Sequence, residues 1–338
     1  MKLGLRKMLQ FVYVVVSSNK DYYLEELWAS LFSLRLYHSE ATVKVLTDAP
    51  TARRIDERRQ LKEMITEVVI VDIPESYSPK ERSRQIKTTV RNIIDGAYLF
   101  IDTDTVICKP LNGIDSIACD IAAVPDGHLP LAEHTFNATV YSNVKQTFET
   151  DIHDSQYWFN SGVMYVADNE RTRQFYKRWN ENWTYSCFEK GNSQDQPALV
   201  KTDKEFGYII ERLPDIYNCQ LALSLKYYAD AAIVHFWHMD FINDQSYSPF
   251  MGLSAYREIK ENDGITPAVE DMIRNCKSSF ESPTMPVGKQ QILYLFSPAG
   301  QVFSQLRSES KQWAELLDKI AMTVIRIRRG IKKIKRLL

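Results

Sequence analysis

The sequence predicts an α/β protein whose mostly parallel sheet is flanked by helices. Strand-like and helical patterns alternate through the first two thirds of the chain, which is typical of parallel sheets with helices on their faces. With 44% hydrophobic and 25% charged residues, the composition is that of an ordinary globular protein and excludes a disordered, collagen-like or coiled-coil chain. A length of 338 residues suits one large domain with an appendage, or two domains.

The predicted strands are short apolar runs rich in β-branched residues, such as the Phe-Val-Tyr-Val-Val-Val of residues 11–16. In chain order they cover residues 11–16, 43–46, 68–71, 98–101, 121–124, 163–166 and 231–237. Ligands of open α/β sheets bind at the carboxyl ends of the strands. Functional side chains are therefore expected just after these segments.

The predicted helices repeat apolar residues every three or four positions, as Leu24, Leu27, Leu31 and Leu34 do. In chain order they cover residues 22–37, 52–64, 83–94, 169–183 and 196–200. The segment 308–338 is expected to form one long helix, or two helices broken near Gly330.

Two regions are predicted, an α/β domain over residues 1–255 and a helical region over residues 256–338. The division falls within residues 240–286, where Gly, Pro and Ser interrupt short helical patches.

The five cysteines are odd in number and widely spaced, and no two form a C-x-x-C pair. This argues against a disulfide framework or a zinc site and favours a reducing, cytoplasmic compartment. The apolar run 11–16 is too short for a signal peptide and is predicted to be a strand. No stretch approaches the roughly 20 apolar residues of a membrane span.

An aspartate pair follows the apolar strand 98–101, in the segment Asp102-Thr103-Asp104. Residues i and i+2 of an extended backbone project to the same side, so both carboxylates can converge on one point. Two such charges are costly together unless a cation joins them, and a hard divalent ion can also bind diphosphate oxygens. A metal–phosphate site is therefore preferred to the alternative, a pair of solvated turn residues.

The run Phe-Ile-Asp-Thr-Asp-Thr resembles the D-x-D motif of GT-A glycosyltransferases, most closely family eight, the relatives of glycogenin and of bacterial galactosyltransferases. Further segments in the expected order extend the resemblance over roughly residues 11–240. The resemblance implies that Asp102 and Asp104 bind Mn²⁺ or Mg²⁺, which holds the diphosphate of a nucleotide-sugar, and it assigns Thr103 to the donor site.

The polar loop after the first strand is similar to the family segment that holds the nucleobase and ribose. Ser17, Ser18 and Asn19 are its candidates, with Asp21 a candidate helix cap. Either Tyr22 or its neighbour Tyr23 is a candidate to stack on the base; the alternative for each is to pack inward.

Three more segments carry candidate donor-binding residues. Arg84 and Lys87 share one helical face that can point at an anion, unless they belong to a solvated charged helix. The Phe-Asn-Ser-Gly motif around Asn160 resembles the family's sugar-contacting strand; the alternative is a bulge glycine with a capping Asn. By resemblance, Asp195 orients sugar hydroxyls and Gln196 lies opposite the leaving diphosphate, while Asp195 also suits an N-cap.

A late apolar strand contains His235, which resembles the family's third metal ligand; the alternative is a core histidine. Imidazole with carboxylates suits Mn²⁺ better than Mg²⁺. The glycine and Lys-Pro-Trp that usually follow in the family are replaced here by Phe-Trp-His-Met-Asp.

The C-terminal segment is strongly basic. Residues 319–338 carry eight Lys or Arg and no acid, whereas residues 1–318 carry 34 basic and 43 acidic groups. Apolar residues recur along it at alternating steps of four and three: Ile320, Val324, Ile327, Ile331, Ile334 and Leu338. This pattern favours a helix lying on an anionic membrane surface over one that packs on the domain, and the acidic body argues against nucleic acid.

Together these features predict a metal-dependent glycosyltransferase, peripheral on the cytoplasmic face of a membrane. It is expected to move a hexose from a nucleotide-sugar, a UDP-sugar by resemblance, to a glycan or lipid-linked acceptor in surface polysaccharide or lipopolysaccharide synthesis. The resemblance implies retention at the anomeric carbon; an inverting reaction would need a carboxylate base, Asp195 or Asp126. The alternatives are a nucleotidyltransferase and a catalytically silent, membrane-associated scaffold of the same fold.

Overall fold

The computed structural model describes residues 9–221, 223–236, 253–277 and 293–334. The chain divides into two compact units, Met1–Pro283 and Thr284–Leu338. The helices α8 (Leu253–Asn262) and α9 (Pro267–Arg274) belong to the first unit, where both contact α1. The division at 255/256 stays a prediction about domains.

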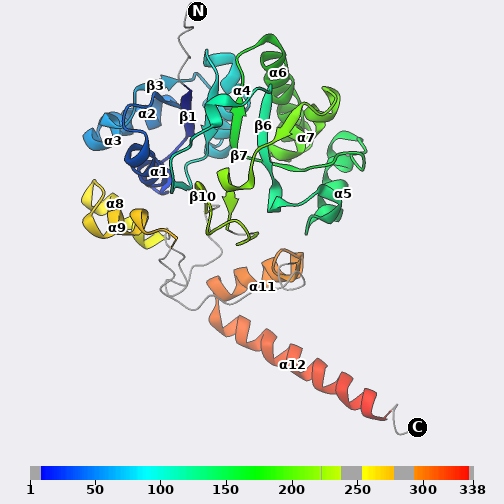
Figure 1. The fold of residues 1–338 in the computed structure, drawn as a ribbon. Coiled ribbons are helices and arrows are strands. Elements are labelled where there is room, and N and C mark those ends of the chain that lie inside the picture. Colours follow the sequence, from blue (N-terminus) through cyan, green and yellow to red (C-terminus); the bar gives the residue numbers. More distant parts are fainter. Residues whose placement is uncertain (1–8, 222, 237–252, 278–292, 335–338) are drawn as a thin grey trace, which may run out of the picture. The chain divides into compact units, whose positions relative to one another are not determined.

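A seven-stranded sheet in the order β3-β2-β1-β4-β7-β6-β8 forms the centre of the first unit (Figure 1). Its strand β7 runs antiparallel to both neighbours, and the other pairs are parallel. The strands are β1 (Gln10–Val15), β2 (Val43–Thr47), β3 (Glu67–Ile70), β4 (Tyr98–Ile101), β6 (Ile121–Pro125), β7 (Phe159–Val166) and β8 (Ile210–Arg212). The predicted fold class, a mostly parallel sheet flanked by helices, is confirmed.

A second, three-stranded sheet in the order β5-β10-β9 lies at the carboxyl end of β4. It consists of β5 (Thr105–Ile107), β9 (Cys219–Gln220) and β10 (Ile233–His235). β10 is antiparallel to β5, and Thr105 is the register partner of His235. The chain that leaves β4 through the aspartate pair therefore runs directly alongside the strand that carries His235.

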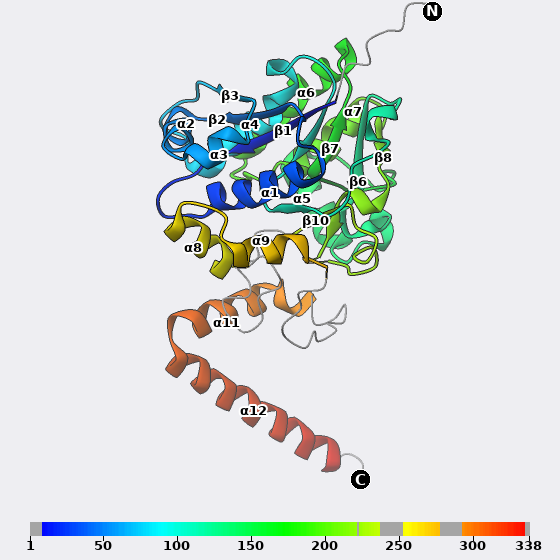
Figure 2. The same ribbon diagram turned by 60° about the vertical axis from the view of Figure 1, so that its left-hand side comes forward.

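Helices cover both faces of the large sheet (Figures 1 and 2). Alternate residues of a strand face opposite sides: Phe11, Tyr13 and Val15 pack with α1, whereas Val12 and Val14 pack with α4 and α6. The remaining helices of this unit in the described residues are bounded as follows: α1 (Tyr23–Tyr37), α2 (Ala49–Asp56), α3 (Arg59–Glu63), α4 (Pro79–Ile93), α5 (Asn137–Phe148), α6 (Glu170–Thr184) and α7 (Gln196–Glu205).

The predicted helix 52–64 is wrong, because this region forms two helices. The Asp48 side chain accepts a hydrogen bond of 3.0 Å from the backbone N–H of Thr51, so α2 begins at Ala49. Arg58 then leaves helical geometry, with φ −109° and ψ 85°. Its guanidinium lies 2.6 Å from the buried carboxylate of Glu25 in α1, an ion pair that the helical pattern does not reveal.

The predicted start of helix 83–94 is also wrong, because α4 begins at Pro79. Ser78 and Glu81 form a capping box in which each side chain accepts a hydrogen bond from the other's backbone N–H. Pro79 suits the first turn, where its missing N–H costs nothing.

The second unit contains α11 (Pro298–Glu309) and α12 (Lys311–Ile334). The two helices separate at Ser310, which has extended backbone angles. α12 continues through Gly330, so the helix break that was considered there as an alternative is not present. Leu338 lies outside the described residues. Within the described part of the chain, none of the helices has the length and apolar character needed to cross a bilayer.

Candidate active site

The turn that carries the aspartate pair is held from several sides. The backbone N–H of Asp102 donates a hydrogen bond of 2.7 Å to the carbonyl of Gly162 in β7. The hydroxyl of Thr105 donates to the carbonyl of Asp102 at 2.9 Å, and the backbone N–H of Phe236 donates to the carbonyl of Asp104 at 2.8 Å. These bonds fix the turn between β7 and β10.

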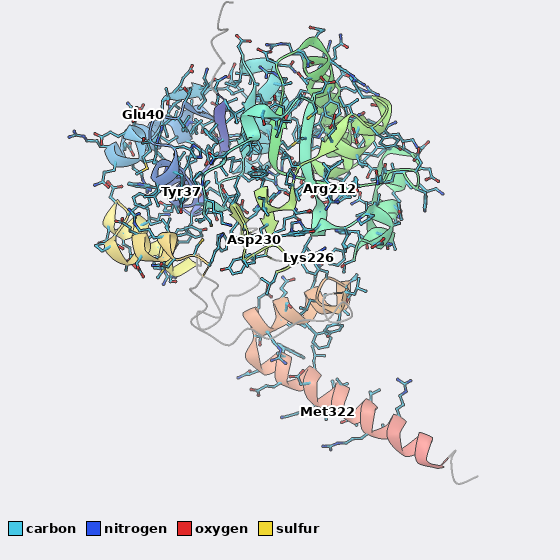
Figure 3. All side chains as sticks on the ribbon, viewed as in Figure 1. Tyr37, Glu40, Arg212, Lys226, Asp230 and Met322 are labelled. Carbon is cyan, nitrogen blue, oxygen red and sulfur yellow. The ribbon has the colours of Figure 1, made fainter. Side chains whose placement is uncertain are left out.

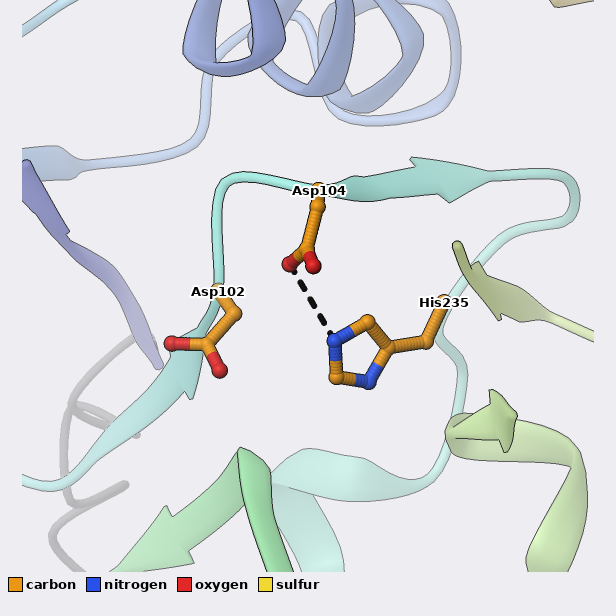
Figure 4. A group of neighbouring side chains, drawn as sticks. All are labelled: Asp102, Asp104 and His235. Carbon is orange, nitrogen blue, oxygen red and sulfur yellow. Dashed lines mark hydrogen bonds and ion pairs between the residues drawn. The ribbon is translucent and has the colours of Figure 1, made fainter. Parts of the chain in front are cut away.

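The structure brings Asp102, Asp104 and His235 together (Figure 4). One potential ligand atom from each lies within 4.8 Å of the others. The His235 imidazole is directed at the Asp104 carboxylate, with Nε2 to Oδ1 at 3.1 Å. The predicted strand-end convergence is therefore present, and its donors are two carboxylates and an imidazole, a set that suits Mn²⁺.

His235 is buried and oriented by Asn218. The amide of Asn218 donates to Asn160 at 2.9 Å, so its Oδ1, which lies 2.9 Å from His235 Nδ1, is the acceptor of the Nδ1–H. This arrangement directs Nε2 at Asp104. Burial lowers the pKa of His235, but the negative charge and hydrogen bond of Asp104 outweigh burial and raise it above its ordinary value.

Gly162 leaves the space that His235 occupies. A Cβ at this position would lie 2.3 Å from His235 Cε1 and 2.9 Å from Nδ1. The glycine of the Phe-Asn-Ser-Gly motif, expected to allow close approach of a ligand, thus allows the close approach of the imidazole.

Two cations and two carboxylates extend the site away from His235. Lys87 is buried and donates to both carboxylate oxygens of Asp102, at 2.9 and 3.0 Å, and its Nζ lies 3.7 Å from Asp195. The guanidinium Nε of Arg84 lies 3.2 Å from the other oxygen of Asp195. The predicted helical face of Arg84 and Lys87 thus points into the site rather than into solvent.

The Asp195 carboxylate is held by a hydrogen bond from Ser161 and by the nearby cations Arg84 and Lys87. Asp195 occupies the N-cap position of α7, but its side chain makes no capping hydrogen bond and instead accepts one of 2.7 Å from Ser161. Burial raises the pKa of Asp195, but the charges of Arg84 and Lys87 and the Ser161 hydrogen bond outweigh burial and hold the pKa well below its usual range. The carboxylate therefore stays ionised, and its side chain does not act as a cap.

Asn160 and Gln196 converge on Asp126. The Asn160 amide donates to Asp126 Oδ1 at 3.0 Å, and its own Oδ1 accepts from the backbone N–H of Gly162. Gln196 donates to the carbonyl of Phe159 at 3.2 Å and lies 3.5 Å from the same Asp126 oxygen. These residues form a polar network at the ends of β6 and β7.

A cavity of about 450 Å³ opens in front of the aspartates, within the usual range for small-molecule sites. Thr103 lines it and donates to Glu26 at 3.3 Å. The lining residues are Val14, Val15, Val16, Tyr23, Glu26, Ser78, Pro79, Lys80, Ser83, Arg84, Asp102, Thr103 and Asp104.

The polar loop after β1 is organised around Asp21. Ser17 and Ser18 donate hydroxyl hydrogen bonds to its two oxygens, at 2.5 and 2.7 Å. Arg54 also donates to the Ser17 hydroxyl, at 2.9 Å. Asp21 thus holds the loop and is not the N-cap residue of α1, which is Tyr22.

Asn19 and Tyr22 are both in contact with α8. Lys260 donates to the carbonyl of Asn19 at 2.9 Å and places its Nζ 4.8 Å from the centre of the Tyr22 ring. Tyr22 packs inward against the core, and its neighbour Tyr23 lines the cavity. Of the two tyrosines, Tyr23 is the one placed to meet a ligand there.

Sequence reasoning missed Asn218, Ser161 and Glu26, whose partners are His235, Asp195 and Thr103 respectively. Ser161 stood within a recognised motif, so its position carried a signal. Asn218 and Glu26 had none, because each meets its partner only through the fold.

Comparisons with known proteins agree with this geometry. Residues 99–237, from β4 to just beyond β10, match the family model of nucleotide-diphospho-sugar transferases. No curated protein matches the chain in sequence.

Solved structures share the fold at low identity. A crystal structure of the galactosyltransferase LgtC with donor and acceptor sugar analogues is 14% identical, with a TM-score of 0.50 over 78% of this chain and 100% of that one. An active-site mutant of LgtC is 13% identical, with a TM-score of 0.50 over 78% of this chain and 100% of that one. Mouse xyloside xylosyltransferase 1 in its apo form is 13% identical, with a TM-score of 0.45 over 68% of this chain and 97% of that one. The matched segment, the aspartate turn at the end of β4 and the fold shared with LgtC together support a GT-A-fold glycosyltransferase that resembles family eight.

Proposed function

We propose that the protein transfers a hexose from a UDP-sugar to a glycan or lipid-linked acceptor, in a metal-dependent and retaining reaction of surface polysaccharide or lipopolysaccharide synthesis. The observation that carries this proposal is the convergence of Asp102, Asp104 and His235 beside the cavity. The likeness in fold to LgtC, whose structure contains donor and acceptor sugar analogues, supports it.

The three side chains fit a divalent ion. They offer two carboxylates and an imidazole, and one potential ligand atom from each lies within 4.8 Å of the others, a donor set and spacing suited to one Mn²⁺ or Mg²⁺. When bound, such an ion supplies positive charge that stabilises the departing diphosphate.

The chain contributes its own cations to donor binding. Lys80 and Arg84 line the cavity on the side of α4, where they can attract a diphosphate. Lys87 lies behind Asp102 and neutralises it, which lowers the cost of holding two carboxylates at adjacent positions before a metal arrives.

The contacts of the two candidate bases favour retention over inversion. An inverting reaction needs a carboxylate that accepts a proton from the acceptor hydroxyl. Asp195 is a poor proton acceptor at neutral pH, because neighbouring cations hold its pKa low. Asp126 has both oxygens engaged, Oδ1 by Asn160 and Oδ2 by His134 at 3.1 Å. The hydrogen-bonded Gln196 amide has no proton-accepting role and suits polar contact with the sugar.

We further propose that α12 lies on an anionic membrane surface and places the enzyme at the cytoplasmic face. Ile320, Val324 and Ile327 lie on one stripe of α12 and are 52–60% exposed. Met322, labelled on α12 in Figure 3, is also apolar and 50% exposed. Each of the eight cations of residues 319–338 contributes about 1 kcal/mol near such a surface.

A panel of nucleotide-sugars with Mn²⁺ tests the reaction. Wild type is expected to release nucleoside diphosphate, and Asp104→Asn, which keeps the size of the side chain, is expected to lose at least 99% of this activity. Asp151→Asn, at an exposed position outside the site, is the matched control and should retain full activity. Release of pyrophosphate would favour a nucleotidyltransferase, and release of neither product would favour a silent scaffold. Unchanged activity in the presence of a chelator would contradict the metal dependence of the reaction.

Sedimentation with vesicles tests the membrane surface. Full-length protein is expected to pellet with vesicles rich in anionic phospholipid and not with neutral ones. Deletion after Asp318 should leave it in the supernatant. Full-length protein that stays in the supernatant with anionic vesicles at low salt would contradict this assignment.

A further inference from the structure

Two cysteine sulfurs meet outside the candidate active site. Cys108 follows β5 and Cys276 follows α9, and their Sγ atoms lie 2.8 Å apart as free thiols. They are separated by 168 positions in the sequence, so only the fold brings them together.

Both cysteines are fixed by the segment that leads into β10. The backbone N–H of Cys108 donates to the carbonyl of Ala232 at 2.8 Å. The hydroxyl of Tyr228 donates to the carbonyl of Cys276 at 2.5 Å. The approach of the two sulfurs is therefore built into ordered backbone.

The two thiols differ in their chemistry. The hydrogen bond between the two thiols, in which either sulfur can be the donor, lowers the pKa of Cys276 and raises that of Cys108. Burial raises both pKa values, and the charge of Lys277 lowers both. Cys276 is thus the better thiolate nucleophile and Cys108 the thiol that lies beside it.

We propose that Cys108 and Cys276 are a thiol pair that hydrogen peroxide converts into a reversible disulfide. The Cys276 thiolate attacks one peroxide oxygen, the O–O bond breaks, hydroxide leaves, and Cys276 becomes a sulfenic acid. The Cys108 sulfur then attacks Cys276 Sγ, the S–O bond breaks, and the Cys108 proton leaves with the hydroxide as water. In total two thiols lose two electrons and two protons, and one peroxide is reduced to two waters.

Peroxide is the oxidant class that fits this site. Cys276 is 3% exposed and Cys108 is partly exposed, so a reagent little larger than water reaches the pair and a bulky disulfide such as oxidised glutathione is disfavoured. A transient, oxidant-dependent disulfide is also the kind that a reducing compartment permits. The cross-link would tie β5, the strand directly after Asp104, to α9.

Peptide mapping of the full-length protein tests this pair independently of sugar transfer. After peroxide treatment, alkylation and digestion without reduction, mass spectrometry is expected to find the Cys108–Cys276 cross-linked peptide as the main oxidised product. Dithiothreitol should remove it. Because the bond closes a long loop, the oxidised protein should also melt about 5 °C higher than the reduced protein.

Variants separate the roles of the two cysteines. Cys108→Ser should prevent the cross-link and leave a sulfenic acid at Cys276 that dimedone labels, whereas Cys119→Ser should behave as wild type. Finding Cys276 alkylated as a free thiol after peroxide, or finding the cross-link only in denaturant, would overturn the proposal. Dimedone labelling of Cys108 in Cys276→Ser, without labelling of Cys276 in Cys108→Ser, would overturn the order of attack.

Discussion

Substituting Gly162 with alanine tests whether His235 is placed as a metal ligand. The added Cβ would lie 2.3 Å from His235 Cε1, whereas ordinary contacts begin at 3.4 Å, so the imidazole must retreat by about 1.1 Å. His235 is buried and hydrogen-bonded to Asn218 and Asp104, so it has no free direction in which to swing. Movement of that size takes Nε2 out of reach of an ion shared with the two aspartates.

The expected loss follows from this displacement. Disturbing the orientation of one ligand costs about 10- to 100-fold in metal affinity, and a misplacement of about 1 Å costs about 100-fold in catalysis. We therefore expect Gly162→Ala to bind Mn²⁺ at least tenfold more weakly than wild type in calorimetric titrations, and to lose a similar or larger factor in turnover.

A second glycine provides the control. Gly207 has a left-handed backbone, with φ 78°, and no atom lies within 4 Å of a Cβ added there. Gly207→Ala should lower the melting temperature through backbone strain and leave Mn²⁺ affinity unchanged. A folded Gly162→Ala protein that binds Mn²⁺ as tightly as wild type would refute the assigned role of His235.

Three further substitutions have distinct expected outcomes. Asn218→Ala removes the acceptor that orients His235, so Mn²⁺ affinity measured by calorimetry should fall about tenfold. Lys87→Met leaves the carboxylate of Asp102 without its ammonium partner, so the free energy of unfolding in urea without metal should fall by about 3 kcal/mol. Burial raises the pKa of Asp203 to about 6, so the stability that its protonated carboxyl contributes is full below pH 3.8 and is lost as pH rises through 6. The free energy of unfolding of Asp203→Asn should therefore exceed that of wild type by about 2–3 kcal/mol at pH 8 and equal it at pH 3.5.

Each of these has an outcome that contradicts it. Unchanged Mn²⁺ affinity in Asn218→Ala would mean that His235 orients itself without this acceptor. Undiminished stability in Lys87→Met would mean that solvent already screens Asp102. An equal effect of Asp203→Asn at both pH values would mean that the carboxyl does not titrate between them.

The sequence was sufficient to predict six of the seven strands of the large sheet and the placement of the metal candidates at its edge, but not β8 (Ile210–Arg212). The six predicted strands carry strong local signals. The two aspartates were expected to converge because extended backbone repeats every two residues, but the structure brings them together through a bend at Thr103 and Asp104 between β4 and β5. Helix boundaries were predicted less well. The start of α4 depends on a capping box that includes Ser78, and the break before α3 depends on the ion pair of Arg58 with Glu25.

The contacts that support the site could not be predicted from local patterns. Gly162 faces His235, and Lys87 faces Asp102, only because strands and helices distant in sequence are packed together. Asp195 illustrates the same point: the pattern predicts a cap, but two nearby cations and Ser161 engage its side chain. Propensity describes a residue's own element, and these partners come from other elements.

Binding of UDP in the presence and absence of Mn²⁺ tests the metal-dependent donor site most directly. In calorimetric titrations, wild type should bind UDP with Mn²⁺ and lose at least 90% of that affinity when the ion is chelated. The double variant Asp102→Asn, Asp104→Asn should bind UDP weakly under both conditions while melting as a folded protein. UDP binding of equal strength with Mn²⁺ and with chelator, in wild type, would contradict a site in which the two aspartates hold the ion that holds the diphosphate.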